Sequence, residues 1–143
     1  MSSQPQRPQI PPDMKAFNAK LIQEFRATGG KLSGPMEGRQ LLLLTTTGSK
    51  SFAPRTVVVG YRSYRDRYAI IASDNGAPKS PHWFANLQAN PVANVEVGAE
   101  NFQVKARVAD PAERTELAKL IEYLDQQQKL TSREIPIVVL EKI

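Results

Sequence analysis

Cysteine is absent from the 143 residues, and histidine and tryptophan occur once each, as His82 and Trp83. Without cysteine the chain has no disulfide, no thiolate metal site and no cysteine nucleophile. One histidine does not suffice for a histidine-rich zinc or iron site, so we expect no metal. No apolar run approaches the about 18 residues of a membrane-spanning helix. The polar, proline-rich start lacks the apolar stretch of a secretory signal, so we expect a cytoplasmic protein.

The net charge is +5, which suggests an anionic partner. Its positive residues are scattered singly, and only the stretch YRSYRDRY (61–68) interleaves arginines with aromatic residues. A solvated pair of strands with a charged turn explains that stretch better than a base-stacking platform does. We therefore expect no nucleic-acid partner, whereas peripheral association with an anionic membrane surface stays open.

The length fits one domain over residues 13–143, preceded by a flexible, proline-rich arm over residues 1–12. A helix is predicted from an N-cap at Asp13 to the stop at Gly29-Gly30, because apolar residues recur there at helical spacing. Short apolar or alternating runs then predict strands, and two segments that begin with Ser-Pro and Asp-Pro predict helices. The predicted order is strands at 41–47, 55–61 and 67–73, a helix from Ser80 to Ala89, strands at 92–97 and 101–108, a helix from Asp110 through Leu124, and a strand at 136–140.

These elements predict a mainly β fold with peripheral helices. About six strands follow one another without βαβ alternation, which argues against a Rossmann sheet. The turn SYRD (63–66) suggests that the strands 55–61 and 67–73 form an antiparallel hairpin. Ser80 is expected to cap the helix that follows it. We therefore expect a small antiparallel barrel, open or partly split.

Two polar segments could carry chemistry. In the first, TTGSKS (46–51) leaves a strand through a glycine turn whose backbone N–H groups could hold an anion, with Lys50 and Arg55 adding charge. It is not a phosphate-binding P-loop, because the first glycine is missing and no helix follows. A plain polar hairpin turn is the alternative explanation for the first segment alone.

The second segment, SDNGAPK (73–79), leads directly into the helix from Ser80, and a helix start beside Lys79 is suited to bind an anion. A loop in which glycine and proline only make the turn is the alternative. Trp83 alone would more often be core than ligand contact, and His82 could donate a proton or only form hydrogen bonds.

Taken together, the two segments resemble the deazaflavin-dependent nitroreductase family, the F420H2-dependent reductases of the split β-barrel, FMN-binding-like fold. The resemblance covers about residues 14 to 141. It rests on LLLLTTTG-x-KS-x-x-x-PR, on AS-x-x-GA-x-K-x-P-x-W-x-x-NL-x-ANP and on the closing strand IPIVVL.

The resemblance implies an F420-dependent oxidoreductase that transfers hydride from reduced F420 to a small acceptor. The acceptors it suggests are α,β-unsaturated carbonyl compounds such as coumarin- or furanocoumarin-like lactones, with nitro compounds and quinones as further candidates. Gly60 and Tyr123 are expected on the substrate side, and Ser73 and Tyr123 are the catalytic candidates. The implied cofactor-binding residues are Ser49, Lys50, Ser51, Arg55, Ile71, Ala72, Ser73, Asp74, Ala77, Lys79, His82, Trp83 and Asn86.

Two other functions remain open on the same fold. The chain could be a non-catalytic protein that binds F420 or lipid, or it could be an FMN-dependent relative. An FMN phosphate needs fewer basic groups than a polyglutamate tail does, which favours F420. The sequence leaves the oligomeric state open.

Overall fold

The structure, a computed structural model, describes residues 14–74 and 76–143. The arm expected over residues 1–12 and the cap expected at Asp13 lie outside the described residues. The elements are α1 (Met14–Thr28), the 3-10 helix η1 (Gly34–Met36), β1 (Leu41–Thr47), β2 (Pro54–Gly60), β3 (Arg62–Tyr64), β4 (Arg67–Ile71), α2 (His82–Ala89), β5 (Val92–Val97), β6 (Glu100–Val108), α3 (Pro111–Leu120), α4 (Leu124–Gln128) and β7 (Ile137–Lys142).

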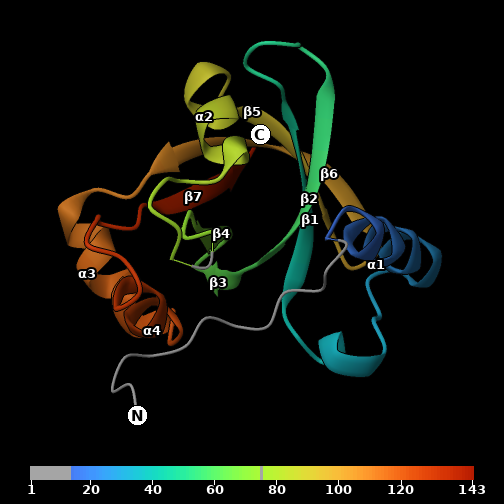
Figure 1. Cartoon of the computed structure of the whole chain (residues 1–143), viewed down its shortest axis with the longest axis horizontal. Coiled ribbons are helices and arrows are strands. Elements are labelled where there is room, and N and C mark those ends of the chain that lie inside the picture. Colours follow the sequence, from blue (N-terminus) through green and yellow to red (C-terminus); the bar gives the residue numbers. More distant parts are fainter. Residues whose placement is uncertain (1–13, 75) are drawn as a thin grey trace.

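All seven strands of the described residues join one antiparallel sheet in the order β2-β1-β5-β6-β7-β4-β3. Figure 1 shows the sheet curling into a half-barrel, with α1 on one side and α3 and α4 on the other. The edge strand β2 returns close to β4 without joining it in the sheet, so the barrel is split there. The mainly β, split-barrel class is therefore confirmed, with seven strands instead of about six.

The β1–β2 hairpin shows why this sequence forms strands. The two strands pair along their whole length, from Leu41 opposite Gly60 to Thr47 opposite Pro54. Their β-branched and leucine side chains suit a pleated surface, and the opposed hydroxyls of Thr45 and Thr56 lie 2.8 Å apart. The hairpin therefore fixes both ends of β2 relative to the turn that connects the strands.

The sheet has an apolar cluster on each face. The inner cluster fills the half-barrel and includes Leu42, Leu44, Ile70 and Val95. The outer cluster lies between β4 and β7 and the segment of α3 and α4; it includes residues such as Leu117, Ile121, Ile135 and Val139. Burial on both faces explains why β4 and β7 read as continuous apolar runs instead of alternating ones.

The hairpin expected between residues 55–61 and 67–73 is wrong. β2 pairs with β1, and β4 pairs with β7 and with the short strand β3, which occupies part of the expected turn. The real turn is two residues long, Arg65-Asp66, and Arg65 takes a left-handed backbone with φ 58°. β2 takes a different partner because β1 offers it a ladder of seven residue pairs.

Two expectations about helices are also wrong. Ser80 does not cap α2, because the helix begins at His82 with Pro81 at the N-cap position and no side-chain cap. The helix expected from Asp110 through Leu124 is two helices, since α3 ends at Leu120 and α4 begins at Leu124. The other predicted boundaries agree with the structure within a few residues, and Asp110 caps α3 in a capping box with Glu113.

Candidate cofactor-binding site

The first segment forms a tight turn between β1 and β2. Gly48 N–H donates to the carbonyl of Ala53 (2.8 Å), and Phe52 N–H donates to the carbonyl of Gly48 (2.9 Å). Phe52 has φ 59°, the left-handed conformation in which glycine usually closes such a turn. A Cβ on Gly48 would lie 2.6 Å from Ser51 Oγ, which can rotate away, and 3.2 Å from the carbonyl oxygen of Ala53, so a side chain here would be crowded. The turn therefore holds its shape through its own backbone.

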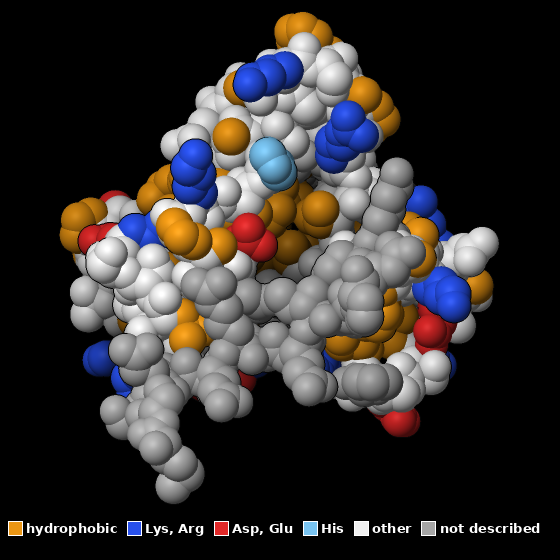
Figure 2. Space-filling view, viewed as in Figure 1, with side chains coloured by type: hydrophobic (Ala, Val, Ile, Leu, Met, Phe, Trp, Pro, Cys, Tyr) orange, Lys and Arg blue, Asp and Glu red, His pale blue; other side chains and the backbone are white. Residues whose placement is uncertain are grey.

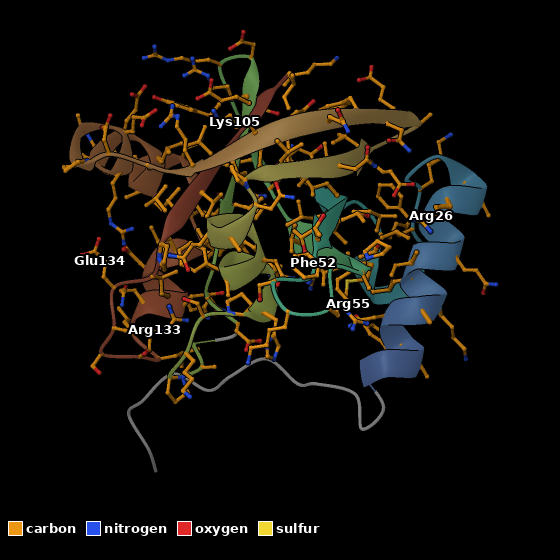
Figure 3. The ribbon with its side chains drawn as sticks, turned by 90° about the horizontal axis from the view of Figure 1, so that it is seen from above. Arg26, Phe52, Arg55, Lys105, Arg133 and Glu134 are labelled. Atoms are coloured by element: carbon orange, nitrogen blue, oxygen red, sulfur yellow. The ribbon has the colours of Figure 1, made fainter. Side chains whose placement is uncertain are left out.

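The cations of this turn have no carboxylate partner among residues 14–74 and 76–143. Lys50 and Arg55 are exposed, and neither forms an ion pair within the described part of the chain. Figure 3 places Arg55 beside the turn, next to Phe52. An anionic group with several charges would find two uncompensated cations here. The ion pairs among the described residues use other arginines, namely Arg26, Arg62, Arg65, Arg67, Arg107 and Arg114.

A buried asparagine on α2 joins the first turn to the second segment. Asn86 Oδ1 accepts from the backbone N–H of Ser49 (3.0 Å), and its Nδ2 donates to Thr46 Oγ1 (3.0 Å). Asn86 is 7% exposed and Thr46 is 1% exposed. Buried polar groups are costly unless they are hydrogen-bonded, so this pair sets α2 against the end of β1. The helix that follows the second segment therefore contacts the first turn.

The second segment is a loop that turns twice before α2. Gly76 N–H donates to Ser73 carbonyl and Ala77 N–H donates to Asp74 carbonyl, both at 3.0 Å. Asp74 and Gly76 have positive φ, at 49° and 75°. A Cβ on Gly76 would lie 2.3 Å from the Cβ of Leu130, so the loop fits tightly against the segment after α4.

One guanidinium holds most of this loop. Arg133 lies between α4 and β7, and all three of its side-chain nitrogens donate to the loop. The contacts are Nε to Ala77 O (2.9 Å), Nη1 to Ser80 Oγ (3.2 Å), and Nη2 to Ala72 O (3.1 Å), Ser73 O (2.8 Å) and Lys79 O (3.3 Å).

The remaining cofactor candidates differ in exposure. Lys79 and His82 are exposed, whereas Ala72 and Trp83 are buried in the inner cluster and Ile71 packs against the outer one. Figure 2 shows a hollow lined with hydrophobic side chains, with the single histidine at its rim and lysine or arginine side chains around it. A flat apolar ring with an anionic tail matches this combination of surfaces.

The two residues expected on the substrate side lie together. A Cβ on Gly60 would lie 3.5 Å from the hydroxyl oxygen of Tyr123. That hydroxyl is buried and has no hydrogen-bond partner among the described residues, and burial raises its pKa. The guanidinium of Arg62 lies 4.8 Å from the centroid of the Tyr123 ring and pairs with Glu122.

A second orphan polar atom lies one helical turn further along α4. Gln127 Oε1 is also buried without a partner in the described chain. Residues four apart share one helix face, so the Tyr123 hydroxyl and this amide oxygen lie on the same side of α4. Ile71 and Tyr123 pack on the same outer cluster, and Leu130 packs on Gly76, so this face runs beside the second loop.

The sequence analysis missed Arg133 and Gln127, because both lie in the polar stretch between Leu124 and Pro136, to which it assigned no element. The signal available for Arg133 was its position, shortly before Pro136 and the apolar strand that follows it. Gln127 gave no signal beyond its spacing from Tyr123. Among residues 14–74 and 76–143 no cluster of three potential metal ligands occurs, and no helix is long and apolar enough to span a membrane.

The fold and the paired loops define a class: split-barrel reductases that bind a flat redox cofactor with an anionic tail. The family model described as F420H(2)-dependent quinone reductase matches residues 19–142, so the chain belongs to this family. It is an oxidoreductase that uses coenzyme F420, as the sequence analysis predicted.

Relatives agree with this assignment. An F420H(2)-dependent quinone reductase of Mycobacterium tuberculosis H37Rv is 37% identical over 127 residues, covering 82% of this chain and 85% of the relative. A solved F420-H2 dependent reductase (FDR-A) is 32% identical with a TM-score of 0.64, over 72% of this chain and 95% of that chain. A solved structure described as a domain-swapped dimer is 30% identical with a TM-score of 0.67, over 86% and 93%.

Proposed function

We propose that this F420H2-dependent reductase acts on activated double bonds of α,β-unsaturated carbonyl compounds, including coumarin- and furanocoumarin-like lactones. Quinones, named for the family and the curated relatives, are a second acceptor class, and nitro compounds a third. When bound, reduced F420 supplies a hydride, and the acceptor takes up this hydride and one proton. The chain's own work is to bind, orient and exclude water.

The proposed tail site is the turn between β1 and β2. Lys50 and Arg55 supply charge that no carboxylate of the described chain neutralises, and Ser49, Ser51 and the exposed Lys79 add donors beside it. The proposed ring site is the second loop with the start of α2. Its residues are Ile71, Ala72, Ser73, Asp74, Ala77, His82, Trp83 and Asn86.

The acceptor is proposed to bind between Gly60 and α4, and the orphan hydroxyl of Tyr123 carries this proposal. A buried hydroxyl without a partner is costly, and an acceptor carbonyl would satisfy it. Because burial raises the pKa of Tyr123, the hydroxyl stays protonated near neutral pH and can donate. Ser73 is the other candidate near the acceptor.

Titration of the purified protein with F420 and with FMN tests the cofactor. Oxidation of F420H2 is then followed with coumarin and with menadione as acceptors. We expect tight binding of F420 only, and oxidation that depends on the acceptor. Binding without turnover of either acceptor would favour a non-catalytic carrier, and preference for FMN would favour a flavin-dependent relative.

Tyr123→Phe tests the acceptor site separately. We expect the KM for the acceptor to rise about tenfold, the equivalent of one lost hydrogen bond, while F420 affinity is unchanged. Gly60→Val narrows the same space and is expected to act in the same direction. An unchanged KM in both variants would move the acceptor elsewhere.

A membrane-surface contact is a second candidate, favoured by one observation. Phe52 is 78% exposed and lies in the same turn as Lys50, close to Arg55. An aromatic side chain with neighbouring cations is suited to the interface of anionic lipids. Co-sedimentation with anionic but not neutral vesicles, weakened by Phe52→Ser, is the expected result; equal binding of the variant would refute this role.

A further inference from the structure

Arg133 stands out because its side chain alone donates to five oxygen atoms between Ala72 and Ser80, in and beside the second loop. Four of its five contacts are backbone carbonyls spread from Ala72 to Lys79, and the fifth is the hydroxyl of Ser80. Among the described residues, the loop's own backbone closes two turns, at Gly76 and Ala77. To these turns Arg133 adds five contacts from outside the loop, so it is a main determinant of the loop's shape.

The arginine is itself held in place by its neighbours. Gln128 Nε2 donates to the carbonyl of Arg133 (2.6 Å), and Gln128 Oε1 accepts from Ile135 N–H (3.0 Å). The N–H of Arg133 also donates to Thr131 Oγ1 (3.3 Å). Because the backbone on both sides is fixed, the guanidinium is pre-organised toward the loop, and less side-chain entropy is lost per hydrogen bond.

The charge of Arg133 has no carboxylate partner in the described chain. Its partners are carbonyl dipoles and one hydroxyl, which solvate the guanidinium without neutralising it. In Figure 3, α2 lies between Arg133 and the turn that carries Phe52. The positive charge therefore lies on the side of the loop away from the first turn. It adds to the positive potential at the N-terminus of α2.

We propose that Arg133 is the positioning residue of the second loop: it fixes the loop's backbone for the deazaflavin ring and keeps a positive charge behind it. This inference rests on the proposed ring site. It predicts that losing the guanidinium disturbs ring orientation, and hence hydride transfer, more than it disturbs the fold.

Arg133→Ala and Arg133→Lys test the proposal, with Arg114→Ala as the matched control. Arg114 also donates from its guanidinium to a backbone carbonyl, that of Ile135 (2.6 Å), which lies in the segment between α4 and β7 that carries Arg133. Arg114 contacts no part of the second loop in the described chain. We expect Arg133→Ala to lower kcat about 100-fold at saturating F420H2, as for a reacting group misplaced by about 1 Å. Arg133→Lys keeps the charge but has fewer donors, and its loss should be smaller. The control should keep kcat within about threefold while losing a similar amount of thermal stability.

Two further readouts separate positioning from general loss of structure. Added guanidinium ions should restore kcat to Arg133→Ala, but they should not restore the F420 affinity that Lys50→Ala loses. Amide hydrogen exchange at residues 73–80 should accelerate in Arg133→Ala without F420, while β1 and β7 stay protected. This exchange measurement stands even if F420 does not bind, so failure of the ring site and failure of the arginine's role are distinguishable. Unchanged exchange, or equal losses of kcat in Arg133→Ala and Arg114→Ala, would overturn the proposal.

Discussion

The first turn and the second loop hold their shapes by opposite means. The turn between β1 and β2 closes through its own backbone, and Lys50 and Arg55 form no ion pair with any residue that the structure describes. The loop before α2 depends on Arg133, which arrives from about 60 residues later in the chain. The turn is closed mainly by its own backbone, with one further bond from Ser49 N–H to Asn86, whereas the loop takes most of its side-chain contacts from Arg133.

This difference matches two demands of the proposed ligand. Exposed lysine and arginine side chains can adjust to a charged tail, because binding of the tail does not require one exact position. Hydride transfer instead requires a ring held in one orientation. The two ends of β2, at Pro54 and Gly60, are about 20 Å apart by strand geometry, so the tail and acceptor sides are well separated. An elongated cofactor would extend from one side toward the other.

The strongest way to break the second loop is to fill the space at Gly76. Gly76→Ala adds a Cβ that would collide with Leu130 and forces a non-glycine residue into φ 75°. We expect the free energy of unfolding to fall by about 3 kcal/mol, the sum of overpacking and left-handed strain. Gly34→Ala, with φ 66° and open space, is the control and should cost about 1 kcal/mol. Equal losses, measured by urea unfolding, would show that the contact with Leu130 does not matter.

Removing charge from the first turn should act on affinity alone. For Lys50→Ala and Arg55→Ala we expect about tenfold weaker F420 binding each, the loss of one charge-assisted hydrogen bond, with kcat at saturation unchanged. Fluorescence titration measures the affinity. Lys105→Ala, an exposed lysine on β6, should bind F420 as the unaltered chain does. A fall in kcat, or no loss of affinity, would contradict the division between tail and ring.

The turn should also tolerate relief of its strain. Phe52 is exposed and has φ 59°, so Phe52→Gly relieves backbone strain. Glycine also has more conformational freedom in the unfolded chain, which offsets part of this gain. We expect the free energy of unfolding to rise by about 0.5 kcal/mol. Arg65→Gly (φ 58°) is the counterpart, but it loses an ion pair with Glu116 and should gain less. A clear loss of stability in Phe52→Gly would mean that the phenyl ring packs within the chain.

A third region offers a change that touches neither loop. Hydrogen bonds from Arg107 lower the pKa of Glu113 to about 2, well below its unfolded value of 4.5. A depressed pKa stabilises the fold above about pH 4.5, and this contribution is lost as the pH falls toward 2. In Glu113→Gln we expect a shallower decline of stability over this window, with F420 affinity unchanged at neutral pH. An unaltered pH dependence would exclude this group as a source of acid lability.

Features set by near neighbours in the chain were predictable. The capping box of Asp110 and Glu113 and the apolar runs of β1 and β7 depend on residues a few positions apart. The choice of β1 as partner for β2 depends on a whole ladder, so the sequence did not reveal it. Ser80 looked like a cap, yet its hydroxyl accepts from Arg133, a contact between residues 53 positions apart.

The site residues divide in the same way, into those that near neighbours in the chain reveal and those that depend on distant contacts. Both polar segments could be found because each is continuous in sequence, and Asn86 joins the helix after the second segment to the first turn. Arg133 could not be assigned a role in advance, because its partners are main-chain carbonyls, which carry no residue type. Which orphan atoms line the acceptor side likewise depends on how α4 packs against the sheet.

The place of β7 in the sheet affects how the protein can be made. β7 lies between β6 and β4, although it is the last strand along the chain. Until residue 142 has been synthesised, β4 lacks one neighbour and β6 has an unpaired edge, which is open to pairing with other chains. Arg133 lies shortly before β7, so the second loop also gains its contacts with this arginine only at that late stage. A nascent chain therefore carries both proposed cofactor-binding segments well before it can fold into a protein able to use them.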